Sequence, residues 1–260
     1  MNGNATEITP EILAAAALSA LGASPALHSS DNLLAFIIEF SARSKAIGPS
    51  GGVAEYFENG KQDADRIRSV MSRLNVSNDS KILEFAAGYG RVSRHLTDLN
   101  MTCADIHADA VEFLIKEIGV SAIKSNDDPD QFDLSETYDF IFVLSFFSHV
   151  PDQLFGRWLS RLSCLLRPGG TLLFTTHGEQ AGRTIPILAD ALQADTGFGY
   201  LRDATDQPDL DGEVYGSSIA TPNYVIRQIY QTKMPTTLVS FSSASWWVLQ
   251  DEWIIAALAK

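Results

Sequence analysis

The sequence predicts an α/β protein with a doubly wound parallel sheet and a helical N-terminal extension. From residue 81 onward, short apolar runs of strand length alternate with stretches of helical spacing. This alternation is typical of parallel strands joined by helical crossovers. Residues 138–145 form a nearly continuous apolar run, as expected of a strand buried on both faces. Residues 1–60 show helical patterning instead.

Three helices are expected before the sheet begins. Thr9-Pro10-Glu11 is a helix start, and Ser30 or Asp31 can cap a second helix. The glycines of residues 48–52 indicate a loop. The predicted helices are residues 10–21, Asn32–Lys45 and Lys61–Leu74.

From residue 81 to residue 258, predicted strands alternate with predicted helices. The predicted strands are 81–86, 101–105, 120–124, 138–145 and 171–176, followed by two strand-like runs at 237–241 and 245–258. The predicted helices between them are 91–99, 108–118, 152–166 and 222–232, and Arg167–Gly170 is expected to be a turn.

Length, charge and cysteine count argue against several classes of protein. The chain has 260 residues, of which 45% are hydrophobic, which is enough for the core of one large domain. Nineteen basic and 32 acidic residues give a net charge of −13, which argues against binding nucleic acid or an anionic membrane surface. Two cysteines are too few for a disulfide scaffold. The apolar run 12–21 is too short to span a membrane, and Glu7 and Glu11 do not suit a signal peptide, so we expect a cytoplasmic protein.

A small-residue turn, Glu84–Arg91, lies between a predicted strand and helix and is the most informative segment. Small residues there allow a ligand to approach the backbone at the carboxyl edge of the sheet. A dinucleotide site requires Gly-x-Gly-x-x-Gly, but the third glycine position falls on Ser93 or Arg91. No phosphate-binding loop of the Gly-x-x-x-x-Gly-Lys-Ser/Thr type occurs. These departures argue against a nicotinamide-dependent oxidoreductase.

Two acidic residues point to another ligand. Glu84 would repel a pyrophosphate but suits a cationic amino group. Asp105, at the end of the next strand and 15 residues after Gly90, can accept hydrogen bonds from two ribose hydroxyls. A nucleoside that carries an amino acid, such as S-adenosylmethionine, matches both.

Four motifs in order resemble those of class I S-adenosylmethionine-dependent methyltransferases over roughly residues 53–258. They are Glu84–Arg91, Ala104–Ile106, Tyr138–Ser145 and Leu166–Gly170. The resemblance implies a Rossmann-like methyltransferase fold with a mostly parallel, seven-stranded sheet whose last strand, near 245–258, is antiparallel. Ala86 stands where the family has its first glycine, and we expect the turn to persist if Ala86 has negative φ.

Further segments resemble a bacterial subgroup of these enzymes, which implies a small-molecule or glycan-like acceptor. They are Phe85–Arg91, Ser145–His149, Thr175–Gly178, Tyr215–Ser217 and Trp247–Asp251. Tyr56 is similar to a residue that leans over the cofactor, although a core aromatic is an equal alternative. The cofactor-binding residues expected from sequence and resemblance are Tyr56, Glu84, Ala86, Gly88, Gly90, Arg91, Asp105, Ile106, Asn126, Asp127, Leu144, Ser145 and Phe146.

His149 and His177 are the candidate catalytic residues. Each follows a predicted strand whose carboxyl end flanks the switch-point crevice, and imidazole titrates in the range that suits a general base. The alternative is a structural loop histidine. No His/Cys/Asp cluster has metal-ligand spacing, so no metal is expected.

The sequence thus predicts direct SN2 methyl transfer from S-adenosylmethionine to oxygen or nitrogen of a small acceptor. The alternative is a non-catalytic protein of the same fold that binds a partner. We expect residues 1–60 to form a cap or a homodimer contact and residues 61–177 the cofactor-binding core. Residues 178–221 are expected to be an insertion or lid, and residues 222–260 to complete the sheet.

Overall fold

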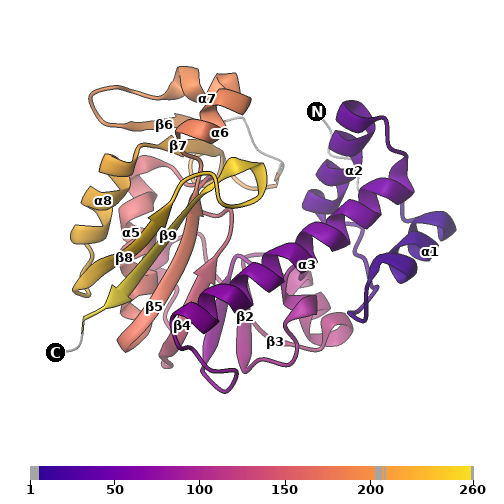
Figure 1. Ribbon diagram of the computed structural model, residues 1–260, viewed down its shortest axis with the longest axis horizontal. Helices are drawn as coiled ribbons and strands as arrows, with labels where there is room; N and C mark the ends of the chain where they lie inside the picture. The colour runs from indigo at the N-terminus through magenta and orange to yellow at the C-terminus, as the bar shows by residue number, and fades with distance from the viewer. Residues whose placement is uncertain (1–5, 203–206, 208, 259–260) are drawn as a thin grey trace. The chain divides into compact units, whose positions relative to one another are not determined.

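A seven-stranded, mostly parallel sheet runs through the chain, as the sequence predicts (Figure 1). The computed structural model describes residues 6–202, 207 and 209–258. The strand order is β3-β2-β1-β4-β5-β9-β8. The bounds are β1 Ile82–Phe85, β2 Met101–Asp105, β3 Ser121–Lys124, β4 Tyr138–Val143, β5 Leu166–Thr176, β8 Thr236–Ser242 and β9 Asp251–Ala257.

The chain folds as two compact units, the first formed by residues up to 78 together with 87–124. It contains α1 Pro10–Ser19, α2 Asn32–Lys45, α3 Pro49–Arg73, the 3₁₀ helix η1 Ser93–His95, α4 Ala108–Phe113 and the π-helical turn η2 Leu114–Ile118. The predicted helix start at Thr9-Pro10-Glu11 is confirmed, and Asp31 rather than Ser30 caps the second helix. The side chains of Thr9 and Asp31 accept hydrogen bonds from the first turns of α1 and α2. Strands β2 and β3 pair in parallel in this unit.

The predicted loop at residues 48–52 is wrong for all but Gly48, because Gly48 is the N-cap and residues 49–52 form the first turn of the 25-residue helix α3. Packing explains two of the glycines. A Cβ on Gly52 would lie 2.7 Å from the Cα atom of Ile38 on α2, and one on Gly51 would overlap Ile47 in the segment between the helices. Gly52 therefore lets α3 approach α2 closely, and Gly51 makes room for the connecting segment.

The predicted helix over residues 91–99 is also wrong, since only the three residues of η1 are helical there. The side chain of Arg94 donates to the carbonyls of Tyr89 and Gly90. Gly90 O also accepts the backbone N–H of Arg94 at 3.2 Å, but the next bonds, from His95 N–H to Val92 O and from Leu96 N–H to Ser93 O, close tighter three-residue turns. A short 3₁₀ helix therefore forms in place of the predicted α-helix.

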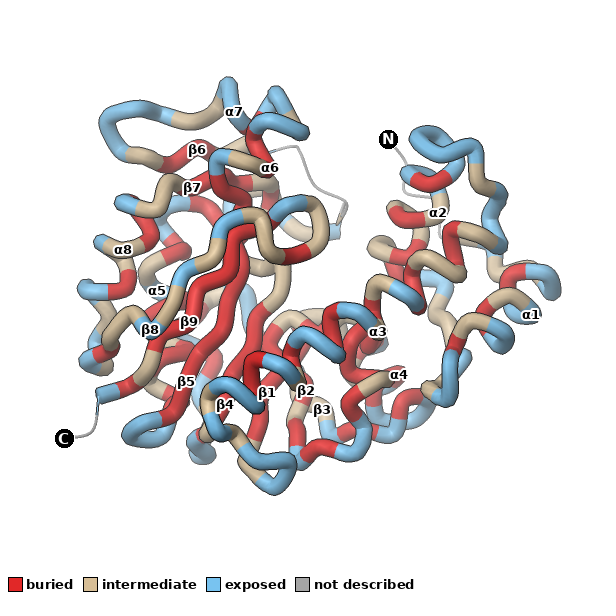
Figure 2. The backbone as a smooth tube through the Cα atoms, viewed as in Figure 1, coloured by how far each residue is buried: buried red, intermediate tan, exposed pale blue. Residues whose placement is uncertain are grey.

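The second unit comprises residues 79–86 and the described residues from 125 onward. Its helices are α5 Asp152–Cys164, α6 Glu179–Thr184, α7 Pro186–Ala191 and α8 Pro222–Tyr230. Two short 3₁₀ helices are η3 Pro129–Gln131 and η4 Trp247–Leu249. The strands β6 Phe198–Leu201 and β7 Ser217–Ala220 pair with each other in a separate antiparallel sheet. Helices α5 and α8 pack together, and Gly156 permits this because its Cβ would lie 2.3 Å from Gln228 Oε1. The strands β4, β5 and β9 are buried along most of their length (Figure 2).

The antiparallel last strand implied by the family resemblance is confirmed, since β9 pairs antiparallel with both β5 and β8. Two details differ from the sequence prediction. Arg167–Gly170 lies within β5 as an irregularity, where the register to β4 shifts. Strand β9 begins only at Asp251, because Val248 and Leu249 have φ values of +57° and +56° that no strand accommodates.

None of the helices within residues 6–202, 207 and 209–258 combines the length and the apolar character that crossing a membrane would need.

Candidate functional site

The small-residue turn after β1 is built from left-handed backbone. Ala86, Gly88 and Gly90 have φ values of +60°, +54° and +74°. The expectation of a negative φ at Ala86 is therefore wrong. Alanine tolerates this conformation at a cost of about 1 kcal/mol, so the turn persists without the family's first glycine.

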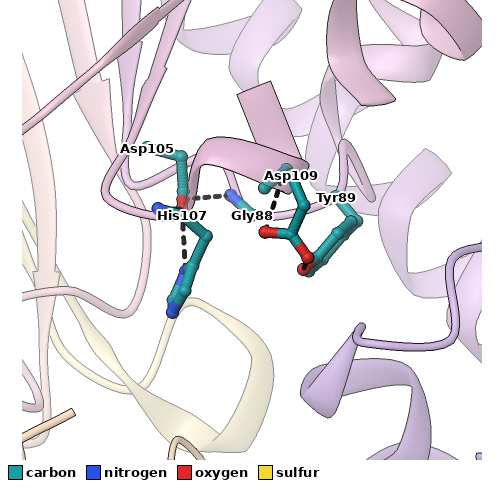
Figure 3. Close-up of polar contacts among 6 residues, drawn as sticks. Gly88, Tyr89, Asp105, His107 and Asp109 are labelled. Carbon is teal, nitrogen blue, oxygen red and sulfur yellow. Dashed lines mark hydrogen bonds and ion pairs between the residues drawn. The ribbon is translucent and has the colours of Figure 1, made fainter. Parts of the chain in front are cut away.

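Asp105, at the end of β2, is held against this turn in the first unit (Figure 3). Its carboxylate is buried, with 5% of the residue exposed. Oδ2 accepts the Gly88 N–H at 2.7 Å, and Oδ1 accepts the backbone N–H of His107 at 3.0 Å and contacts its ring Nδ1 at the same distance. A carboxylate offers about four lone-pair sites. Asp105 is thus oriented rigidly and retains capacity for a further donor; Ile106, beside it, is half-buried.

Tyr89, between the two glycines, carries a contact that the sequence analysis did not find. The ring of His28 stacks on it, with centroids 4.7 Å apart and planes 13° apart. The Tyr89 hydroxyl donates to Asp109 at 2.8 Å (Figure 3). Burial and the Asp109 carboxylate raise the pKa of Tyr89 well above its ordinary value. Because His28 has no motif around it, no local signal marks this contact.

Arg91 and Tyr56, both expected at the cofactor, are engaged inside the first unit. Arg91 forms a buried ion pair with Asp63 at 2.7 Å. Tyr56 is fully buried on α3, and its hydroxyl donates to Asp31 at 2.6 Å. Burial raises the pKa of Asp31, although the Tyr56 hydrogen bond opposes that shift. Within the first unit, Arg91 thus links the turn to Asp63 on α3, and Tyr56 links α3 to Asp31, the N-cap of α2.

In the second unit, Glu84 lies on β1 and is buried, with 5% exposed. Strands β1 and β4 are parallel neighbours with Glu84 opposite Phe142. The residues that follow β4, Leu144, Ser145 and Phe146, are half-buried. The ring of Phe146 packs edge-on against Phe85 with centroids 5.0 Å apart. The structure therefore brings Glu84 and the segment after β4 to neighbouring strand ends.

Asn126 and Asp127 are exposed in the loop after β3. The Asn126 side-chain oxygen accepts the backbone N–H of Asp128 at 3.0 Å. The Asn126 side chain therefore stabilises the turn in which it lies. The expected contact of Asn126 with adenine stays a prediction.

His149 and His177 are brought together, with ring centroids 6.0 Å apart. The Nδ1 atom of His149 lies 2.6 Å from the carbonyl oxygen of Gly216, and that of His177 lies 3.1 Å from the carbonyl of Ser218. A carbonyl only accepts, so each neutral ring carries its hydrogen on Nδ1 and its lone pair on Nε2. Tyr215 stacks on His149 at 4.7 Å. The segment that leads into β7 thus orients both rings.

The two histidines are expected to differ as bases and in their effect on acid stability. Burial, and secondarily the neighbouring His149, lower the pKa of His177 to about 4. The unfolded chain takes up this proton near pH 6.5, so the stability contributed by His177 is complete above that pH and is lost as the pH falls towards 4. Between pH 7 and 5 the free energy of unfolding should fall by about 2 kcal/mol more in the wild type than in His177→Gln.

Urea unfolding at the two pH values measures this difference. His95, whose pKa burial also lowers to about 4, contributes equally to both proteins and cancels. An identical pH dependence in the two proteins would contradict the buried, neutral state of His177.

The glycines of the turn should respond differently to alanine. A Cβ on Gly90 would lie 2.9 Å from Leu114 Cδ2, whereas one on Gly88 meets nothing within 4 Å. Gly88→Ala should therefore lose only about 1 kcal/mol of stability from its positive φ. Gly90→Ala should lose about 2–4 kcal/mol, because overpacking adds to the backbone strain. Urea unfolding of the two variants tests the order, and equal losses would be inconsistent with the packing of Gly90.

Among the residues that the structure describes, no three His, Cys, Asp or Glu side chains gather as ligands of a metal ion would.

Comparison with known proteins indicates the family to which this chain belongs. A family model described as a methyltransferase domain matches residues 55–206. A search of curated proteins found no significant match. The fold is similar to that of an S-adenosylmethionine-dependent methyltransferase from Clostridium acetobutylicum, with a TM-score of 0.57 and 13% identity over 87% of this chain and 98% of the other.

Two further structures share the fold at low identity. Magnesium protoporphyrin IX methyltransferase from Synechocystis, solved with bound S-adenosylhomocysteine, has a TM-score of 0.53 and 13% identity over 80% of this chain and 87% of its own. The glycopeptide N-methyltransferase MtfA, solved with S-adenosylmethionine, has a TM-score of 0.53 and 12% identity over 78% of this chain and 95% of its own. Since the family model covers more than half of the sequence and the sheet has the order expected of this fold, the chain belongs to the methyltransferase-domain family.

Proposed function

We propose that this protein transfers the methyl group of S-adenosylmethionine to an oxygen or nitrogen atom of a small-molecule or sugar-like acceptor. The observation that carries the proposal is the buried Asp105 carboxylate, which is fixed by Gly88 and His107 at the end of β2. A carboxylate so held is suited to the paired hydroxyls of a ribose. Two structures of similar fold contain S-adenosylmethionine or its product.

The residues of the turn fit this cofactor and not a dinucleotide. Asp105 and Glu84 are both buried acceptors. Asp105 suits a ribose hydroxyl in either class of cofactor, whereas Glu84 suits an amino group and would repel a pyrophosphate. A Cβ on Gly88 would meet no protein atom within 4 Å, so the backbone there is open to a ligand. When bound, S-adenosylmethionine supplies an electrophilic methyl group on its sulfonium sulfur, so this chain's residues need chiefly to align the acceptor and receive its proton.

His149 is the proposed general base. Its Nδ1–H donates to Gly216 O at 2.6 Å, which holds the lone pair on Nε2. His177 has a pKa of about 4, chiefly through burial, and is therefore a poorer proton acceptor near neutral pH than an ordinary imidazole. We assign His177 to binding the acceptor. The segment from Tyr215 to Ser218, which orients both rings, would form one side of the acceptor site.

His149→Gln should lower kcat by about 10²–10⁴-fold, the usual contribution of a positioned general base. Its dissociation constant for S-adenosylhomocysteine should stay within about twofold of the wild type, because the base does not hold the cofactor. Transfer assays with S-adenosylmethionine and a panel of hydroxyl and amine acceptors provide kcat, and calorimetry provides the dissociation constant. An unchanged kcat would remove His149 from the mechanism.

The proposed cofactor is tested by calorimetric titration of S-adenosylhomocysteine and NAD into the wild-type protein after removal of co-purified ligand. Binding of S-adenosylhomocysteine alone supports the proposal. Binding without transfer to any acceptor in the panel would favour a non-catalytic partner protein. Binding of neither ligand, or of NAD alone, would overturn the cofactor assignment.

A further inference from the structure

A closed ring of hydrogen bonds joins three strand ends in the second unit. The backbone N–H of Ser145, after β4, donates to Thr175 Oγ1 on β5 at 2.8 Å. The Thr175 hydroxyl donates to Gln250 Oε1 at 2.6 Å. Gln250, immediately before β9, returns its Nε2–H to Ser145 Oγ at 3.0 Å. Thr175 and Gln250 are 1% and 3% exposed, so the ring is shielded from water.

The ring holds Ser145 in a conformation that it would not adopt by itself. Ser145 has a φ of +61°, in the left-handed region that is unfavourable for a residue other than glycine. Hydrogen bonds to both its backbone N–H and its side chain offset that cost. Such local strain, held by the surrounding structure, is common where a side chain is aimed at a ligand.

The Ser145 hydroxyl is the most weakly held donor of the ring. Thr175 donates its hydroxyl hydrogen to Gln250 Oε1, because an amide oxygen only accepts. Ser145 Oγ accepts from Gln250 Nε2 at 3.0 Å and donates to Gln250 Oε1 at 3.3 Å, which is longer than the usual O–H···O bond of about 2.5–3.0 Å. The hydroxyl hydrogen of half-buried Ser145 can therefore turn from this long bond to a stronger acceptor on a ligand.

Ser145 leaves the sheet at the strand next to Glu84. Strands β1 and β4 are parallel, so the carboxyl end of each lies on the same edge. Glu84 is an acceptor and suits the ammonium of an amino acid, whereas the carboxylate of that amino acid needs a donor. A hydroxyl donor that follows β4 and a buried acceptor on β1, at the same edge of the sheet, are the two kinds of group that an amino-acid zwitterion requires.

We propose that Ser145 donates its hydroxyl hydrogen to the carboxylate at the amino-acid end of the bound cofactor, and that Thr175 and Gln250 are positioning residues that aim this hydroxyl. The inference rests on the proposed function, since it takes S-adenosylmethionine as the ligand. It assigns roles to two residues, 75 positions apart, that the sequence analysis left without one.

The test compares two ligands that differ at the amino-acid end. Calorimetry gives dissociation constants of S-adenosylhomocysteine and of 5′-methylthioadenosine, which lacks the amino acid. Ser145→Ala should weaken binding of S-adenosylhomocysteine roughly 10-fold or more, as loss of a hydrogen bond to a charged group predicts. Thr175→Val and Gln250→Met should weaken it roughly 5-fold, since a misaligned hydroxyl retains part of its bond. Binding of 5′-methylthioadenosine should change less than about twofold in all three, because this ligand makes none of these bonds.

A matched control lies on the same strand. The buried hydroxyl of Thr171 makes no hydrogen bond to any residue within the described part of the chain, so Thr171→Val should leave both dissociation constants unchanged. The double variant Ser145→Ala/Gln250→Met should bind no more weakly than Ser145→Ala alone, because Gln250 acts through Ser145. Ser145→Ala adds no backbone strain, since serine and alanine both carry a Cβ, and it remains a valid test if a buried variant fails to fold.

The outcomes separate the two proposals. If the wild type does not bind S-adenosylhomocysteine, the proposed function itself fails. If the wild type binds it but the ring variants weaken both ligands equally, or weaken neither, the proposed function survives and the role of the ring is overturned.

Discussion

Asp105→Ala is expected to weaken binding of S-adenosylhomocysteine by roughly 100-fold or more. The variant removes the charged acceptor that is proposed to bind a ribose hydroxyl, and a hydrogen bond of that kind contributes about 1.5–3 kcal/mol. It also removes the acceptor of the Gly88 N–H, at 2.7 Å, so the Gly-rich turn loses its support. Calorimetric titration of both proteins measures the change.

Two further variants identify the cause of that loss. Asp105→Asn keeps one side-chain oxygen and should fall between alanine and the wild type. Asp109→Asn removes the charge of a nearby but exposed carboxylate that binds Tyr89, and it should alter affinity less than about threefold, as expected of a surface charge. If Asp105→Ala binds as well as the wild type, Asp105 does not hold the ribose.

Arg94→Met is expected to reduce the free energy of unfolding by about 3–5 kcal/mol, because each buried carbonyl that loses its donor costs about 1–3 kcal/mol. Arg94 is 2% exposed. Its guanidinium donates to the carbonyls of Ser24 and Ala26 in the N-terminal segment and of Tyr89 and Gly90 in the turn, at 2.8–3.0 Å. Methionine fills the volume but leaves these four carbonyls without that donor.

Urea unfolding compares Arg94→Met with Arg43→Met. Arg43 has 68% of its side chain exposed and pairs with Glu39 one helical turn away, so its loss should cost less than about 1 kcal/mol. Equal effects of the two substitutions would show that the Arg94 network adds little stability. A second consequence is local. Because Arg94 holds both segments, His28 should unstack from Tyr89 in Arg94→Met, which tyrosine fluorescence can follow.

The elements that the sequence predicted correctly depend on neighbours along the chain. The side chains of Thr9 and Asp31 each accept a hydrogen bond from a backbone N–H three residues further along the chain. The apolar run of β4 is continuous in sequence. Such signals lie within one helical turn or one strand and survive any tertiary arrangement. The Glu84–Arg91 turn and Asp105 also belong to this class, since each directly follows a strand and a strand end fixes which edge of the sheet a residue occupies.

Other features depend on contacts between distant residues. Gly52 lies where α3 packs closely against α2, and the Arg94 side chain binds the carbonyls of Tyr89 and Gly90 where a helix was predicted to begin. The same holds for the left-handed φ of Ala86 and for the Ser145 ring, whose members are 30, 75 and 105 positions apart.

The sequence by itself thus determined that a parallel sheet forms and that Glu84 and Asp105 lie at the carboxyl ends of its strands. Hydrophobic periodicity and helix caps can be recognised in the sequence because they involve residues only a few positions apart. Only the tertiary structure decided which distant side chains hold these residues in place. A hydrogen bond between distant residues has no local pattern, and it forms only after the core has brought its two ends together.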